Sequence, residues 1–359
     1  MLVAVYHFED LIVRFIPEAV SMFFAKCYLM VDVFFIMSGL IITHVYQSNF
    51  RDHVSGSDFW KFIVARFARI YPLHFLMLLV IVISFLASGA PSDPIQNPIA
   101  IPTNLLLIHS FGLHNSFTWN VPSWSISAEW WCYMLFPLLI WLLDRWKRAA
   151  IPCFLFVSAL AYVGIMYWLP RVGVAGERLL PLPHDLNVTF DYGFLRGVAG
   201  FMIGMLLYKL YELPLMRAGF KSDWLFFVFL ILTIGCLHFA APDIFSIPLF
   251  AGIVMCAACN DGSIHRLFER PILQLIGDVS YSIYMLHVVV LFGAIELLGV
   301  FGVTFAKAPL NLVSFWVGLL ACAMFLVVVV LLSTLSYRFI EKPCRDFINR
   351  RSRAAVMAR

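Results

Sequence analysis

Three ionisable side chains lie within or beside strongly apolar stretches of the chain: His7 in MLVAVYHF, Asp32 in VDVFFIMSGLII and Glu129 in WSISAEWW. An ionisable group at membrane depth costs about 2.5 kcal/mol or more, so such groups usually face a bundle interior and serve a function. Histidine, with an unperturbed pKa of about 6.5, can take a proton near neutral pH. A carboxylate beside it can orient the imidazole or bind a hydroxyl. The three residues therefore predict a polar site inside a membrane protein.

Each of these residues also has a purely structural interpretation. His7 could be a buried histidine bonded to a neighbouring helix. Asp32 could be an acid near a helix start that interacts with the positive end of the helix dipole. Glu129 could cap a helix within an interfacial belt of aromatic side chains. The residue types alone therefore leave catalysis and packing both open.

The composition is that of an integral membrane protein. Of the 359 residues, 62% are hydrophobic and 13% are charged, and the mean hydropathy is +0.90. Soluble domains carry about 25% charged residues. Continuous apolar runs predict helices rather than strands, because an open sheet edge cannot be satisfied in lipid. We predict an all-α polytopic bundle with about ten transmembrane helices, at residues 1–17, 29–46, 71–88, 129–144, 150–168, 191–209, 222–240, 244–260, 278–299 and 311–335.

Basic residues orient this bundle, since Lys and Arg collect in the short cytoplasmic loops of membrane proteins. They follow every second predicted span, whereas residues 88–127 contain no Lys or Arg. Both termini are therefore predicted to face the cytoplasm, with the loop around Arg171 and Arg178 as a mild exception. Scattered bases give no support to nucleic-acid binding. The clusters are Arg51, Lys61, Arg66 and Arg69; Arg145, Lys147 and Arg148; Lys209, Arg217 and Lys221; Arg266 and Arg270; and the bases of residues 338–353.

The cysteines and loop histidines predict no metal site. Cys256 and Cys259 form a CxxC on one helix with no second pair, which is typical of packing rather than zinc or redox chemistry. His109 and His114 lack a carboxylate or a third ligand. With no internal repeat or linker, we predict one membrane domain at residues 1–345 and a basic cytoplasmic tail at residues 346–359. The first span is short, since about a dozen largely apolar residues precede Arg14 where a crossing needs about 20.

Six motifs occur in order along the chain: His7 after an apolar run, VDVFFIMSGLI, RFARIYP, WSISAEWWCYMLFPLL, GDVSYSIYMLH and RFIEKP. Together they resemble the acyltransferase 3 family of integral-membrane acyltransferases, over nearly the whole chain. The resemblance implies transfer of an acyl group, commonly acetyl, from cytoplasmic acyl-CoA to a hydroxyl of an exported glycan, in the bacterial inner membrane. The family usually has an arginine eleven residues before the histidine, a position that would precede Met1 here.

The resemblance also implies roles for the polar residues. His7 is predicted to be the base or a transient acyl carrier, and Asp32 and Glu129 are predicted to support it. Arg66 and Arg69 are three apart, so on a helix they share one face and can grip the phosphates of acyl-CoA. Anchoring at the cytoplasmic surface is the alternative for this pair.

A polar stripe at helical spacing, formed by Tyr281, Tyr284 and His287, should face the bundle interior, either lining the site or tying helices together. Gly39 is expected to allow close helix approach. Glu341 is expected to form a cytoplasmic salt bridge that seats the last helix. The residues predicted to bind the acceptor, where Trp side chains could stack on a sugar ring, are Trp119, Asn120, Trp124, Ser127, Tyr281 and His287.

A transporter or flippase of a glycolipid or small solute is the alternative function. Buried ionisable groups and many spans suit transport as well. Against it, the chain shows no internal repeat and no matched pair of broken helices, which many secondary transporters have. Product formation that depends on acyl-CoA would separate the two functions. The sequence predicts no particular oligomeric state.

Overall fold

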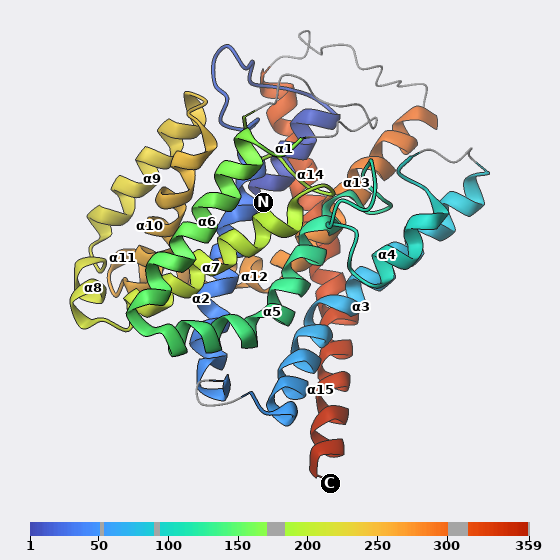
Figure 1. Ribbon diagram of the computed structural model, residues 1–359. Helices are drawn as coiled ribbons and strands as arrows, with labels where there is room; N and C mark the ends of the chain where they lie inside the picture. Colours follow the sequence, from blue (N-terminus) through green and yellow to red (C-terminus); the bar gives the residue numbers. More distant parts are fainter. Residues whose placement is uncertain (51–53, 90–93, 171–183, 301–314, 358–359) are drawn as a thin grey trace.

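The computed structural model describes residues 1–50, 54–89, 94–170, 184–300 and 315–357. Over these ranges the chain is built from helices and forms no strand (Figure 1). Arg51, Arg171 and Arg178, which entered the prediction of topology, lie outside the described residues. The helices are α1 (Leu2–Leu11), α2 (Met30–Phe50), α3 (Gly56–Ser88), α4 (Ile101–Leu105), α5 (Trp124–Trp146), α6 (Ala150–Tyr167), α7 (Gly193–Tyr211), α8 (Pro214–Gly219), α9 (Asp223–His238), α10 (Ser246–Cys259), α11 (Ser263–Phe268), α12 (Pro271–Asp278), α13 (Ser280–Val300), α14 (Phe315–Ser336) and α15 (Lys342–Met357).

Each of the ten predicted spans overlaps one of these helices, but they differ in length. Six helical stretches of the described chain are long and apolar enough to cross a membrane. One of them contains both α5 and α6, which turn at Lys147 (φ 50°). Helices α1, α9 and α10 have 10, 16 and 14 residues, below the about 20 that a perpendicular crossing needs. The six stretches are Cys27–Phe50, Gly56–Ser88, Val121–Tyr167, Gly193–Tyr211, Ser280–Gly299 and Phe315–Ser352.

The third helix begins much earlier than predicted, at Gly56 rather than residue 71. Ser55 caps it, because its Oγ accepts a hydrogen bond of 3.1 Å from the backbone N–H of Asp58. Helix α3 then runs through Pro72 and rises obliquely across the bundle in Figure 1. As a result, Arg66 and Arg69 lie inside a helix and not in a loop before it.

Helices α2 and α7 form the tightest contact in the centre of the bundle. A Cβ on Gly39 would lie 2.0 Å from the backbone oxygen of Phe201, and a Cβ on Gly204 would lie 2.0 Å from that of Ile36. Only glycine allows two helix backbones to approach so closely. The prediction for Gly39 is therefore confirmed, and Gly204 is its counterpart on α7.

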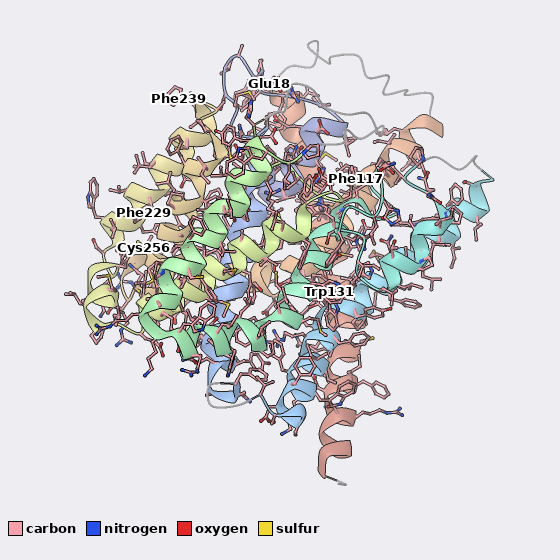
Figure 2. The ribbon with its side chains drawn as sticks, in the orientation of Figure 1. Glu18, Phe117, Trp131, Phe229, Phe239 and Cys256 are labelled. Carbon is pink, nitrogen blue, oxygen red and sulfur yellow. The ribbon has the colours of Figure 1, made fainter. Side chains whose placement is uncertain are left out.

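The outer surface of the bundle is apolar, as a lipid-facing surface must be. Large side chains project outward from several helices, among them Phe156 (67% exposed), Trp224 (73%) and Leu320 (62%). Helices α9 and α10 pack together, with Phe229 of α9 against Gly252 of α10. Cys256 of α10 is a buried free thiol; Figure 2 labels Phe229 and Cys256. The CxxC cysteines thus lie in helix packing.

A buried carboxylate holds the segments at one end of the bundle. Asp243 accepts hydrogen bonds from Lys26 Nζ (2.6 Å), from Tyr28 Oη (2.6 Å) and from the backbone N–H of Leu186 (2.7 Å). The residues between α1 and α2 lie at the top of Figure 1, whereas the end of α2, the start of α3 and the end of α15 lie at the bottom.

Candidate functional site

A cavity of about 380 Å³ brings together polar residues that are far apart in the sequence. Its walls come from α2, α3, α5, α12 and α13. Arg66, Arg69, Glu129 and Tyr281, all predicted as site residues, line it. The remaining polar side chains of the wall are Ser38, Ser125, Tyr133, Ser280 and Tyr284.

Arg66 has no carboxylate partner within the described part of the chain. Its Nη2 donates to Tyr46 Oη at 3.0 Å, and its guanidinium lies 5.2 Å from the centre of that ring and 5.8 Å from the centre of the Tyr133 ring. Its Nε is buried and finds no hydrogen-bond partner there either. Arg66 therefore lines the cavity with a charge that no carboxylate of the described residues neutralises.

Arg69 is bound differently, since it forms an ion pair with Glu341. Glu341 is 1% exposed and lies in a π-helical turn (Tyr337–Glu341) between α14 and α15, where it also accepts a hydrogen bond of 2.9 Å from Ser282 Oγ. The guanidinium of Arg69 lies 5.8 Å from the centre of the Tyr281 ring. The predicted salt bridge of Glu341 is confirmed, and its partner is one of the two predicted phosphate-binding arginines.

Glu129 lies deeper in its helix than predicted. Helix α5 begins at Trp124, so Glu129 is more than one turn inside it instead of at its start. One carboxylate oxygen, Oε1, accepts hydrogen bonds from Ser38 Oγ (3.2 Å) and from the hydroxyl of Tyr133. The second oxygen has no protein partner among the described residues. A carboxylate therefore shares the cavity with two arginines without pairing to either.

A second, mostly apolar cavity of about 290 Å³ adjoins the first, and both are lined by Phe34, Met37, Ser280 and Tyr284. His287 lies in its wall. The ring centre of His7 is 5.2 Å from that of His287, and the ring centre of Tyr284 is 5.7 Å from that of His287. A row of rings thus leads from the first cavity to His7.

Asp32 and His7 line neither cavity; His7 lies behind His287 of the second cavity. Asp32 forms a fully buried ion pair with Arg196 of α7, in which Nη2 lies 2.6 Å from Oδ2 and Nε lies 3.2 Å from each carboxylate oxygen. Tyr162 donates to Oδ1 at 3.3 Å, and Arg196 also donates to the backbone oxygens of Tyr28 and Val188. Sequence reasoning missed Arg196, although a single arginine in the apolar run GFLRGVAGF is the signal that could have found it.

The predicted acceptor residues near residue 120 also lie outside both cavities. Trp119 donates from its backbone to Ile95 (2.8 Å) and from Nε1 to the backbone oxygen of Asn97 (3.1 Å). Ser127 Oγ donates to the backbone oxygen of Leu107 at 2.6 Å, and Asn120 Nδ2 donates to that of Met285 at 3.4 Å. The bonds of Ser127 and Asn120 tie residues 94–123 to α5 and α13.

Trp124 packs against Gly193, and the guanidinium of Arg196 lies 5.5 Å from its ring centre. Trp131, labelled in Figure 2, adds an indole hydrogen bond of 2.8 Å to the backbone oxygen of Leu107. Trp131 thus ties residues 94–123 to α5, whereas Trp124 packs against α7.

The two loop histidines, His109 and His114, each form a hydrogen bond through Nε2. His109 Nε2 bonds to Ser123 Oγ at 3.0 Å, and His114 Nε2 bonds to Thr103 Oγ1 at 2.7 Å. Burial, together with the neighbouring His74 ring, lowers the pKa of His109 to about 3, so that it is neutral at physiological pH. Within the described ranges, no group of three or more His, Cys, Asp and Glu side chains is placed to hold a metal ion.

Comparison with known proteins finds a family model and several named proteins that match most of the chain. The family model described as "Acyltransferase domain" (Acyl_transf_3) matches residues 1–334. The chain is 26% identical over 351 residues to "Acyltransferase MdmB" of Streptomyces mycarofaciens, covering 91% of this chain and 83% of that protein. It is 25% identical over 284 residues to "Nodulation protein 10" of Rhizobium leguminosarum bv. viciae, covering 73% and 71%.

A third relative is longer than this chain. "Peptidoglycan O-acetyltransferase OatA" of Listeria monocytogenes is 22% identical over 360 residues, which cover 89% of this chain and 52% of that protein. No solved structure matches the chain significantly.

Proposed function

The chain belongs to the acyltransferase 3 family, and from this premise we propose that it moves an acyl group, most simply acetyl, from acyl-CoA to a hydroxyl of an exported or cell-surface glycan. It is an acyltransferase and an integral membrane protein. The observation that carries the finer proposal is the cavity in which two arginines, an unpaired carboxylate oxygen and several hydroxyls meet inside an apolar bundle.

We assign the phosphates of the acyl-CoA donor to Arg66 and Arg69. Arginine matches phosphate oxygens with paired donors, and it keeps its charge at any physiological pH. Arg66 supports this assignment best, because its charge has no carboxylate partner in the described structure and its Nε is buried without a partner. Arg69 is shared with Glu341, so its part is also to join α3 to the turn before α15.

His7 is the proposed base or acyl carrier. In the direct route its unprotonated nitrogen takes the hydroxyl proton of the acceptor while that oxygen attacks the thioester carbonyl. The C–S bond breaks, and the CoA thiolate takes the proton from His7. In the other route His7 attacks first and passes its own N–H proton to the departing thiolate. The acceptor hydroxyl then takes the acyl group and returns a proton to His7. Both routes end in an ester and free CoA.

The two carboxylates receive different roles. Glu129 lies in the cavity and has one oxygen held by Ser38 and Tyr133, so we assign it to binding a hydroxyl of the substrate with the other oxygen. Asp32 supports the site from outside, because its pair with Arg196 fixes α2 against α7. Each of α2 and α7 contributes to the tight contact at Gly39, and α2 supplies one wall of both cavities.

A glycan acceptor suits the names of the relatives, one of which is a peptidoglycan O-acetyltransferase. We assign Tyr281 and His287 to the walls around the acceptor, since both line a cavity. Asn120 and Ser127 then act by tying residues 94–123 to α13 and α5, and Trp119 acts within that segment. Trp124 acts through its packing against α7.

For topology we propose ten membrane-embedded helices, of which α1, α9 and α10 are shorter than a perpendicular crossing, in a bacterial inner membrane with both termini in the cytoplasm. The end of α2, the start of α3 and the end of α15, which lie at the same end in Figure 1, are then cytoplasmic. Residues 1–345 form the acyltransferase domain, and residues 346–359 form a basic tail that begins within α15. In this orientation acyl-CoA enters from the cytoplasm and the acceptor approaches from the opposite side.

The direct test measures transfer of labelled acetyl from acetyl-CoA to membrane glycans, for membranes that contain equal amounts of each variant. His7→Ala should lower transfer by about 10²–10⁴-fold, which is the contribution of a positioned base. His265→Ala is the matched control, because His265 is an exposed histidine outside both cavities. Near-normal transfer by His7→Ala would refute the assignment. Absence of labelled product from the wild type, with acetyl-CoA and with longer acyl-CoAs, would favour transport instead.

A further inference from the structure

His287 is held in one tautomer by the backbone of its own helix. Its Nδ1 lies 2.6 Å from the backbone oxygen of Tyr284 and 3.2 Å from that of Ile283. A carbonyl oxygen only accepts hydrogen bonds, so Nδ1 must carry the proton. In the neutral ring the lone pair is then at Nε2.

That lone pair has no partner in the part of the chain that the structure describes. Nε2 of His287 is buried and finds no hydrogen bond among the described residues, and the side chain is 0% exposed. Buried polar atoms in native proteins are nearly always paired, so an orphaned acceptor in a cavity wall indicates a partner that arrives during function or a bridging water. His287 lies in the wall of the second cavity, where such a partner can reach it.

The nearest candidate is His7. The two ring centres are 5.2 Å apart, and the ring planes are tilted by 39°. His7 itself makes no hydrogen bond within the described part of the chain. A histidine that acts as base or nucleophile needs one nitrogen unprotonated toward the substrate and an acceptor for the N–H on the other nitrogen. Carboxylates often supply that acceptor, but no carboxylate of the described residues is hydrogen-bonded to His7, and Glu129 lines the first cavity and not the second.

We propose that His287 is the positioning residue of His7: its Nε2 accepts the N–H of His7, directly after a small ring rotation or through one water, and this sets the tautomer of His7. The second nitrogen of His7 then presents its lone pair to the reacting centre. This inference rests on the proposed function of His7 and is made for the direct route, in which His7 keeps this N–H throughout the reaction. The chain of contacts runs from His7 to His287 Nε2, and from His287 Nδ1 to the backbone oxygen of Tyr284.

Two amide variants separate this role from simple packing. In His287→Gln the terminal amide group lies near the original position of Nε2, so its oxygen can accept from His7. In His287→Asn the amide is one carbon shorter and lies near the original Nδ1, so it can bond to the backbone of α13 but cannot replace the acceptor. Both variants put a neutral amide into the same buried site, which makes each a control for the other.

The experiment measures acetyl transfer from acetyl-CoA to membrane glycan by the full chain in lipid nanodiscs, with thermal unfolding of each variant as a check of folding. We expect His287→Asn to lower kcat by about 10–100-fold, as loss of an orienting partner typically does, with little change in KM for acetyl-CoA. His287→Gln should lower log kcat by no more than half as much as His287→Asn does. In the His7→Ala background, His287→Asn should cause no further loss, because the residue that it positions is gone.

A buried histidine outside the site measures the structural cost alone. His74 in α3 is 1% exposed, bonds through Nε2 to the backbone oxygen of Asn104 (2.9 Å), and has an unpartnered Nδ1. His74→Gln should leave kcat within about twofold per folded molecule.

Equal losses in the Asn and Gln variants of His287, or a further loss in the His7→Ala background, would overturn the positioning role while leaving the proposed function intact. Transfer that does not need His7 would overturn both.

Discussion

The buried pair of Asp32 and Arg196 permits a prediction with a definite magnitude. Both side chains are 0% exposed, and three of the hydrogen bonds of Arg196 go to the Asp32 carboxylate. Removing one partner leaves the other charge buried and unpaired, which typically costs about 3–5 kcal/mol. We therefore expect Asp32→Ala and Arg196→Ala each to lower the free energy of unfolding by that amount. At roughly 1.3 °C per kcal/mol for a chain of 359 residues, the melting temperature should fall by about 4–7 °C.

The double variant Asp32→Leu/Arg196→Met distinguishes a buried charge pair from two independent contacts. Replacing both charges with apolar side chains removes the unpaired charge, so the double variant should be more stable than either single alanine variant. Thermal unfolding of the purified protein in detergent measures this. The exposed pair of Lys221 and Asp261 is the matched control, and Lys221→Ala should cost less than about 1 kcal/mol.

Activity of the same double variant tests the catalytic prediction for Asp32. If Asp32 supports the site by fixing α2 against α7, transfer should return with stability. A stable double variant without transfer would assign Asp32 a direct chemical role. If the destabilisation of the double variant equals the sum of the single effects, the reasoning from an unpaired charge is wrong.

Three further outcomes are expected. Gly39→Ala should destabilise strongly in thermal unfolding, because its Cβ would lie 2.0 Å from a backbone oxygen of α7, whereas Gly235→Ala, with open space at that position, should not. Arg66→Ala should raise the KM for acetyl-CoA at least tenfold, and Arg66→Lys should raise it less, since lysine keeps the charge but loses the paired donors. Arg270→Ala, at an exposed arginine, is the control. An unchanged KM in Arg66→Ala would remove Arg66 from the donor site. The pKa of His109 is about 3 in the folded protein and about 6.5 in the unfolded chain, so between these pH values only the unfolded chain binds the proton. The free energy of unfolding should therefore fall as the pH falls from 6.5 toward 3. His109→Gln should reduce this pH dependence in melting curves recorded at several pH values.

Local pattern was enough to find most elements and part of the site. A run of apolar residues determines where a chain enters lipid, because each helix satisfies its own backbone there. For this reason every predicted span overlaps a helix. Helical periodicity also placed Arg66 with Arg69, and Tyr281 with Tyr284, on shared faces, and each of these pairs lines the first cavity. Boundaries were less well predicted: the Ser55 cap and a helix that continues through Pro72 moved the start of α3 to Gly56.

Partnership across the bundle was decided by the tertiary structure alone. Asp32 and Arg196 are 164 positions apart, and Arg69 and Glu341 are 272 apart, so no local pattern connects them. The sequence marked Asp32, Glu129 and His7 as equally costly groups in apolar surroundings. In the packed bundle each has a different environment. Asp32 is neutralised by Arg196, Glu129 shares a cavity with Arg66, and His7 lies beside His287. The sequence by itself determined that a polar site lies inside a membrane-embedded bundle, since hydrophobicity and helical period are local properties. Only the packed helices decided which of these residues meet, because the energy of a buried charge depends on what lies against it.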